Sequence, residues 1–115
     1  EAGYRQALAS LPEDAIVLNN LAMLLVEERR NLSEAVELAE RAVGIRPQVA
    51  TLRDTQAAAY RAAGDLGRAV EAWRAAVRLE PAHPEWRINL GEALVAAGDA
   101  AGAAELIGPI DADEN

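Results

Sequence analysis

The chain has 115 residues, about one domain's worth, and its 19 acidic and 11 basic residues give a formal net charge of −8. Because nucleic-acid phosphates require clustered cations, this charge argues against a nucleic-acid partner. The absence of cysteine excludes a disulfide framework and a thiolate metal site, and the abundance of alanine favours helices over strands.

Apolar periodicity and helix-boundary residues predict seven helices, in chain order over residues 2–11, 14–28, 31–45, 49–63, 65–80, 84–97 and a short last helix that ends at Gly108-Pro109. Asp14 is the candidate N-cap of the second helix. Asn31 is the candidate N-cap of the third, where Glu34 can complete a capping box. Gly64 suits a left-handed C-cap, and Asp65 directly begins the fifth helix. Helices joined by such short turns can stack only as antiparallel neighbours.

The helices repeat one another along the chain. Ala35, Ala69 and Ala103 are 34 residues apart, and Pro47 and Pro81 follow the same spacing. A period of this length indicates a solenoid, in which each helical hairpin buries its apolar face against its neighbours. A solenoid is typically a binding surface, so the period predicts a class of function without naming a partner.

Within each period the order of small and large apolar residues resembles the tetratricopeptide repeat, of a bacterial type. Three copies carry the resemblance: Leu18, Leu21, Ala22, Leu25, Ala35, Ala39, Ala42 and Pro47; then Ala57, Tyr60, Gly64, Ala69, Trp73, Ala76 and Pro81; then Leu90, Gly91, Leu94, Gly98 and Ala103. The resemblance implies an all-α fold, an α-α superhelix of about seven antiparallel helices. It divides a single array, 1–115, into a partial repeat (1–12), two repeats (14–48 and 49–83), a shortened repeat (84–110) and an acidic tail (111–115).

Two features of this pattern bear on packing. Ala22, Ala57 and Gly91 are expected where the two helices of a hairpin come closest, because a larger side chain would separate them. Gln56 stands where the family has a large apolar residue, which predicts a looser hairpin or an internal polar contact. The period also resembles that of RNA-reading helical repeats. The negative net charge, together with Trp73 and Pro81 at their tetratricopeptide places, disfavours that alternative.

The resemblance implies a superhelix whose concave wall is formed by the first helix of each hairpin. Helical geometry then selects the residues about one turn from the packing stripe. These candidate peptide-binding residues are Asn19, Asn20, Met23, Thr51, Asp54, Thr55, Glu85, Ile88, Asn89 and Glu92. Asn20, Thr55 and Asn89 occupy one equivalent row, and an Asn amide can both donate to and accept from an extended backbone. The alternative interpretation is that these side chains are ordinary solvated helix surface.

The charge of this wall predicts the charge of its ligand. Asp54, Glu85 and Glu92 favour a neutral or basic segment. Tetratricopeptide co-chaperones that bind the C-terminal carboxylate of heat-shock proteins use groove Lys and Arg, whereas here Glu85 stands in place of a cation and Asn89 in place of an Arg. We therefore expect this wall to repel a free carboxylate.

No catalytic or cofactor chemistry is predicted. His83, the only histidine, precedes Pro84 and is most simply the residue before a helix. A metal site would need further ligands at helical spacing, which the surrounding sequence does not supply. Neither serine has a base nearby in the sequence, so we expect no enzyme activity, no cofactor and no metal.

Two functions remain open from the sequence. The first is a scaffold or assembly module that binds a peptide segment or partner protein in the concave groove. The second is a regulatory or substrate-docking arm of a larger enzyme, such as a glycosyltransferase, whose catalytic domain lies outside this chain. Apolar residues in the first and last helices predict self-association through the ends. The chain shows no membrane span and no signal segment, and either the cytoplasm or the periplasm is compatible with it.

Overall fold

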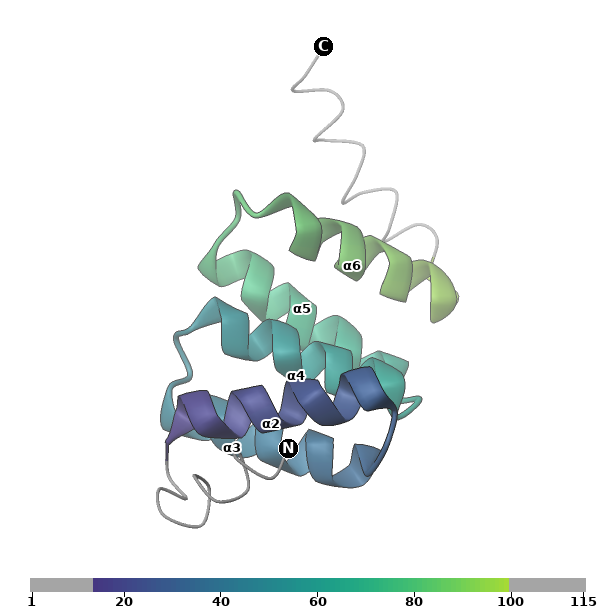
Figure 1. Ribbon diagram of the computed structural model, residues 1–115. Helices are drawn as coiled ribbons and strands as arrows, with labels where there is room; N and C mark the ends of the chain where they lie inside the picture. Colours follow the sequence, from purple (N-terminus) through teal and green to yellow (C-terminus); the bar gives the residue numbers. More distant parts are fainter. Residues whose placement is uncertain (1–13, 100–115) are drawn as a thin grey trace.

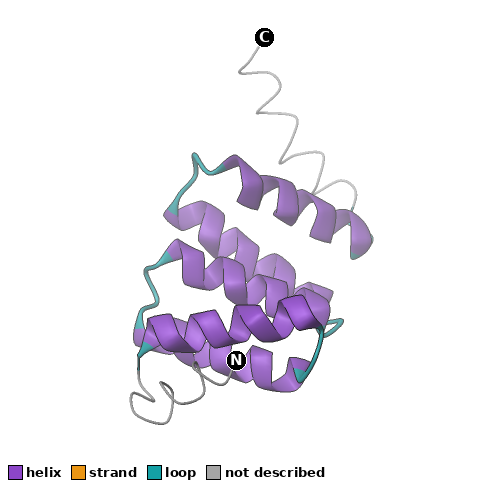
Figure 2. Ribbon diagram, viewed as in Figure 1, coloured by secondary structure: helices purple, strands orange, loops and turns teal. Residues whose placement is uncertain are grey.

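The computed structural model describes residues 14–99, which form five helices and no strand (Figures 1 and 2). The helices are α2 (Ala15–Glu28), α3 (Leu32–Ile45), α4 (Ala50–Ala62), α5 (Leu66–Leu79) and α6 (Pro84–Ala96). Short connections join them, at residues 29–31, 46–49, 63–65 and 80–83. The all-α prediction is therefore confirmed, and the five helices match the second to sixth predicted ones. The first and seventh lie outside the described residues.

The predicted N-cap at Asp14 is confirmed, and Asp65, predicted to begin the fifth helix, caps that helix as well. Asp14 Oδ1 accepts hydrogen bonds from the backbone N–H groups of Ile16 (2.9 Å) and Val17 (3.2 Å) at the start of α2. Asp65 Oδ1 accepts one from the N–H of Arg68 (3.2 Å) at the start of α5. Each carboxylate satisfies amide groups that have no partner within the first helical turn, and its negative charge favours the positive end of the helix dipole.

The predicted cap at Asn31 is wrong. Asn31 directly precedes α3, but its φ of 50° is left-handed and its side chain makes no capping hydrogen bond. Arg29 is left-handed as well, with φ of 52°, so the connection turns through two such residues within three positions. An N-cap side chain reaches the first amides of a helix from an extended backbone, and the left-handed conformation removes that geometry.

The helices pack as a stack of antiparallel hairpins. α2 pairs with α3 and α4 with α5, while α3 contacts α4 and α6 packs against α5 (Figure 1). Ala22, Ala57 and Gly91, which the resemblance places where paired helices come closest, are all buried. Leu25 and Leu94 are buried too, and a fully buried leucine contributes about 1.5–3 kcal/mol to folding.

The two hairpins also contact each other through their first helices, because α2 packs directly on α4. α4 therefore packs on three described neighbours, α2, α3 and α5, which leaves little of its circumference open. Among residues 14–99, no helix combines the length and the hydrophobicity that a membrane span requires.

Candidate functional site

The predicted wall residues lie on α2 and α4, the first helices of the two described hairpins, and on α6, but they differ in exposure. Thr51, Glu85, Ile88 and Glu92 are exposed, whereas Thr55 is buried. The remaining side chains are half-buried: Asn19, Asn20, Met23, Asp54 and Asn89. We call all of these residues except Thr55 the wall.

Thr55 belongs to the interior and not to the wall. It is 2% exposed, and its Oγ1–H donates to the backbone carbonyl of Thr51 at 3.3 Å. Thr55 shares a helical stripe with Leu52 and Ala59, which are part of the core cluster formed with α2 and α3. The expected row of Asn20, Thr55 and Asn89 is thus broken in the middle, because the packing of α2 on α4 covers this position.

Asp54 is held by a contact that the sequence analysis missed. The indole Nε1–H of Trp73, on α5, donates to Asp54 Oδ1 at 2.8 Å, and the Trp73 ring is fully buried. The guanidinium of Arg61 lies over the same ring, 4.9 Å from its centre. Trp73 therefore fixes one acid and one cation of α4 on a single indole, through a hydrogen bond and a cation–π contact.

A sequence signal for this arrangement was available. Trp73 stands one repeat after Ala39, so the second hairpin carries an indole where the first carries a methyl group. A buried indole N–H needs an acceptor, and Asp54 is the acceptor here. The larger side chain also reaches the next helix, because Trp73 lies in one core cluster with Leu90 and Leu94 of α6.

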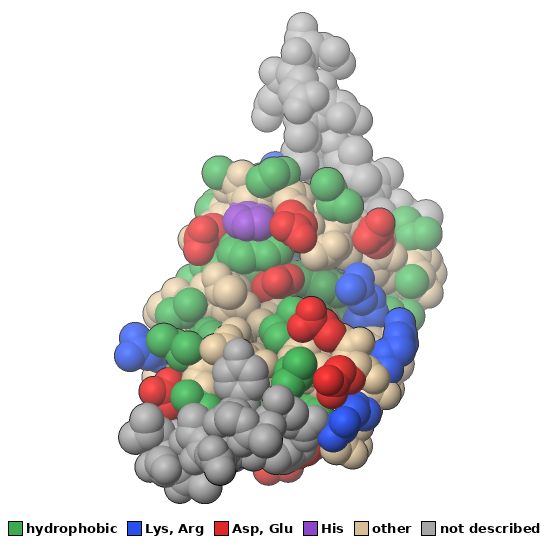
Figure 3. Space-filling model, viewed as in Figure 1, with side chains coloured by type: hydrophobic (Ala, Val, Ile, Leu, Met, Phe, Trp, Pro, Cys, Tyr) green, Lys and Arg blue, Asp and Glu red, His purple; other side chains and the backbone are tan. Residues whose placement is uncertain are grey.

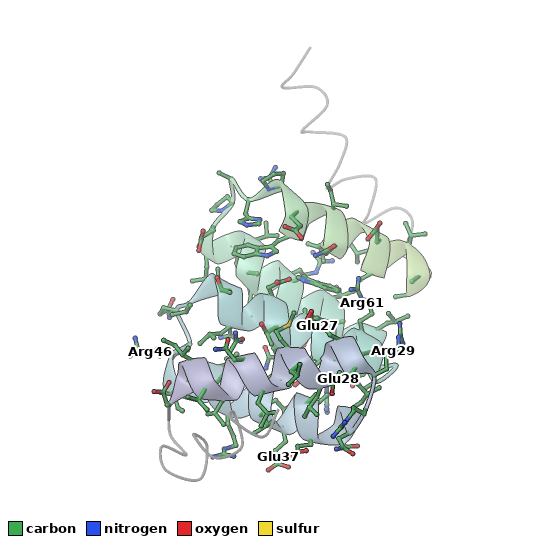
Figure 4. The ribbon with its side chains drawn as sticks, viewed as in Figure 1. Glu27, Glu28, Arg29, Glu37, Arg46 and Arg61 are labelled. Atoms are coloured by element: carbon green, nitrogen blue, oxygen red, sulfur yellow. The ribbon has the colours of Figure 1, made fainter. Side chains whose placement is uncertain are left out.

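Charged side chains define the electrostatics of this part of the molecule. Figure 3 shows Asp and Glu side chains spread over α2, α4 and α6, with most of the visible Arg side chains at the rim. Glu27, Glu28, Arg29 and Arg61 all lie on the side of the stack where α2 and α4 end (Figure 4). The wall itself contributes three acids, Asp54, Glu85 and Glu92.

One part of the wall is apolar. Ile88 and Glu92, together with Gly91 and Val95, line a shallow hollow of about 420 Å³ on α6. Ile88 is 59% exposed and Val95 60%, so both side chains are open to a ligand. The half-buried amide of Asn89 is therefore one position from a residue, Ile88, that lines an apolar hollow.

His83 and the acidic residues give no metal site. His83 is the N-cap residue of α6, as predicted, with Pro84 in the first turn of the helix. Its imidazole stacks on the indole of Trp86 with a centroid distance of 3.7 Å. Across the described part of the chain, no three His, Asp or Glu side chains are grouped so that they could hold a metal ion.

Comparison with known proteins identifies the fold. Two family models described as tetratricopeptide repeat match this chain, one over residues 1–50 and the other over residues 60–115. The chain belongs to the tetratricopeptide-repeat family. It is thus a helical-repeat scaffold of a kind that generally binds other proteins and carries no catalysis of its own. No curated protein matches the sequence.

Solved structures agree on the tetratricopeptide superhelix. MamA from Desulfovibrio magneticus RS-1, residues 41 to the end, superposes with a TM-score of 0.87 at 22% identity, over 96% of this chain and 62% of that one. A MamA RS-1 double mutant gives a TM-score of 0.84 at 23% identity, over 90% of this chain and 58% of that one. A further crystal structure of MamA gives 0.82 at 18% identity, over 90% and 60%. At these identities the likeness shows the fold alone, and this chain spans about three fifths of the chains it matches.

Proposed function

We propose that this tetratricopeptide protein is an interaction scaffold whose wall binds an extended segment of another protein, with a neutral or basic segment preferred. The observation that carries the proposal is the combination of groups on α2 and α6. Asn20 and Asn89 keep half-buried amides at equivalent positions, and the exposed carboxylates of Glu85 and Glu92 lie beside the second of them. Amides can pair with a peptide backbone, and the carboxylates select the charge of its side chains.

Asn19 supports the same function. Its Oδ1 is buried and has no hydrogen-bond partner among the described residues. An unpaired buried acceptor costs about 1–3 kcal/mol, so a donor brought by a ligand would be favourable.

The test uses peptides selected on the protein itself. A random peptide library is displayed, the binders of the wild-type chain are sequenced, and their dissociation constants are measured on variants. We expect the selected peptides whose binding depends on the wall to be neutral or basic. The double variant Asn20→Ala/Asn89→Ala should bind them at least tenfold more weakly, since two hydrogen bonds of about 1 kcal/mol each are lost.

The matched control is Ser33→Ala/Gln48→Ala, which also truncates two polar side chains, both exposed and both outside the wall. It should bind as the wild type does. Circular dichroism confirms that both variants keep their helices. Unchanged affinity in a folded Asn20→Ala/Asn89→Ala variant, or selection of strongly acidic peptides by the wall, would contradict the proposal.

A further inference from the structure

A second surface of the chain has the opposite charge to the wall. A hollow of about 520 Å³ lies between α4 and α5, and four of the residues that line it are Arg53, Arg68, Arg74 and Arg78, against one acid, Glu71. We call these four side chains the arginine groove. A smaller hollow of about 200 Å³ shares Arg53 and Arg78 with it and continues towards the α3–α4 connection.

The arginine groove lies on the opposite side of the α4–α5 hairpin from Trp73. On α5, Arg68 and Arg78 fall on a stripe that points away from Trp73, given 100° of rotation per residue. Trp73 packs towards α6, with Leu90 and Leu94. The arginine groove is therefore a surface separate from the Asp54–Trp73–Arg61 cluster.

The cations of the arginine groove are poorly compensated. Arg53 Nε is buried and has no hydrogen-bond partner within residues 14–99, and no ion pair of Arg53, Arg74 or Arg78 forms among those residues. Arg68 has one exposed contact, 3.6 Å from its Nε to Asp65 Oδ2. Unpaired guanidinium groups gathered in a hollow are unusual in a chain with a net charge of −8, in which acids are plentiful.

Gln56 adds a neutral polar group to the same hollow. The family pattern places a large apolar residue there, and the sequence predicted a looser hairpin or an internal polar contact. In the structure Gln56 is half-buried and lines the arginine groove beside Arg53. The small residues Ala72 and Ala75 line it as well, so the hollow has room for a chain to lie along α5.

We propose that the arginine groove binds an acidic segment of a partner protein. Guanidinium groups form forked, charge-assisted hydrogen bonds with carboxylates, which a lysine cannot reproduce. From Arg68 to Arg78 the helix rises about 15 Å, at ~1.5 Å per residue. This length accommodates about four or five residues of an extended peptide at ~3.3 Å each. The Gln56 amide is placed to pair with the backbone of that peptide.

The rest of the molecule favours a peptide over a nucleic acid. A phosphate polymer would extend beyond the hollow and be repelled by a chain whose net charge is −8. A short acidic segment places its charge only where the arginines lie. This ligand is acidic, whereas the segment proposed for the wall is neutral or basic. The two surfaces can therefore be occupied at once by different segments.

The probe is a fluorescein-labelled five-residue peptide that alternates Asp and Glu with Ala, compared by anisotropy with the peptide in which every acid is replaced by its amide. We expect the acidic peptide to bind at least tenfold more tightly than the amide peptide. The variant Arg74→Glu/Arg78→Glu should weaken the acidic peptide by more than tenfold. A single-stranded oligonucleotide of equal charge should bind at least tenfold more weakly than the acidic peptide.

The control variant is Arg29→Glu/Arg46→Glu, which changes the net charge by the same amount at two exposed positions outside the groove. It should change the affinity for the acidic peptide by less than threefold. An equal loss in both variants would show only a general effect of net charge and would overturn the proposal. Oligonucleotide binding as tight as that of the peptide would overturn it too. Circular dichroism of both variants excludes unfolding as the cause of a loss.

Discussion

Asp54 and Trp73 are 19 positions apart in the chain and form one hydrogen bond between the two helices of a hairpin, from the indole Nε1–H to Oδ1 at 2.8 Å. Trp73→Phe keeps most of the ring but removes the donor, leaves a small cavity and leaves the carboxylate unpaired. We expect the free energy of unfolding to fall by about 2–3 kcal/mol, as measured by urea denaturation. Asp54→Asn keeps an acceptor for the indole and should cost less than about 1 kcal/mol. A larger loss for Asp54→Asn than for Trp73→Phe would contradict this reading of the pair.

We expect the protein to lose stability in alkaline solution because the Tyr60 hydroxyl ionises. Its O–H donates to Glu40 Oε2 on α3, and burial, followed by this hydrogen bond and the charge of Glu40, raises the pKa of Tyr60 to about 12. Because the folded pKa lies above the unfolded value of about 10, the protonated hydroxyl contributes fully below about pH 10, and its contribution is lost as the pH rises towards 12. We expect the free energy of unfolding to fall by about 1–2 kcal/mol over this range, with some of the shift screened by solvent.

Tyr60→Phe separates this effect from other alkaline titrations. The variant lacks the ionisable hydroxyl and should lose about 1 kcal/mol at neutral pH, since one hydrogen bond is removed. Its unfolding free energy should then decline less steeply between pH 10 and 12 than that of the wild type. Parallel declines in the two proteins would show that Tyr60 is not the group responsible.

Two glycines are expected to respond oppositely to the same substitution. Gly64 has φ of 88°, whereas Gly44 lies within α3 and has no positive φ; an added Cβ would meet no atom within 4 Å at either position. Backbone conformation alone therefore decides the outcome. Gly64→Ala should destabilise the fold by about 1–2 kcal/mol, and Gly44→Ala should stabilise it by about 0.5–1 kcal/mol. Urea denaturation of the two single variants measures both changes, and an equal sign for the two would contradict the argument.

Local signals account for the elements that the sequence predicted well. Asp14 and Asp65 each precede an apolar stripe and need only their own helix to act as caps, and Gly64 needs only its own backbone. Asn31 also precedes an apolar stripe, but its side chain does not cap α3. The reason is that the connection before α3 carries two left-handed residues. That conformation depends on how α2 and α3 meet, which no single residue type reveals.

The wall was less predictable because it depends on contacts between repeats. The repeat pattern placed Thr55 on the concave wall, yet the packing of α2 on α4 buries it. The role of Arg53 and Arg78 was also missed, since they are distant in sequence and meet only when α4 folds onto α5. Gln56 was the one clue, a polar residue at an apolar position of the repeat, and the arginine groove gives that departure a physical meaning.

Self-association through the ends of the array is the last expectation. The apolar residues on which it rests in the sequence, Tyr4, Leu8, Leu11, Leu106, Ile107 and Ile110, lie outside the described residues. On the last described helix, Ile88 and Val95 are 59% and 60% exposed, which places further apolar surface near the C-terminal end of the stack. Contact between two copies there would remove apolar surface from water at about 25 cal/mol per Å². We expect sedimentation velocity at tens of micromolar to show dimers or larger species.

The variant Ile88→Gln/Val95→Gln should shift the distribution towards monomer. The control Ile45→Gln/Val49→Gln, which changes two partly exposed apolar residues elsewhere, should not. A wild-type chain that sediments as a clean monomer would refute the prediction, and an equal shift in both variants would place the contact elsewhere than α6.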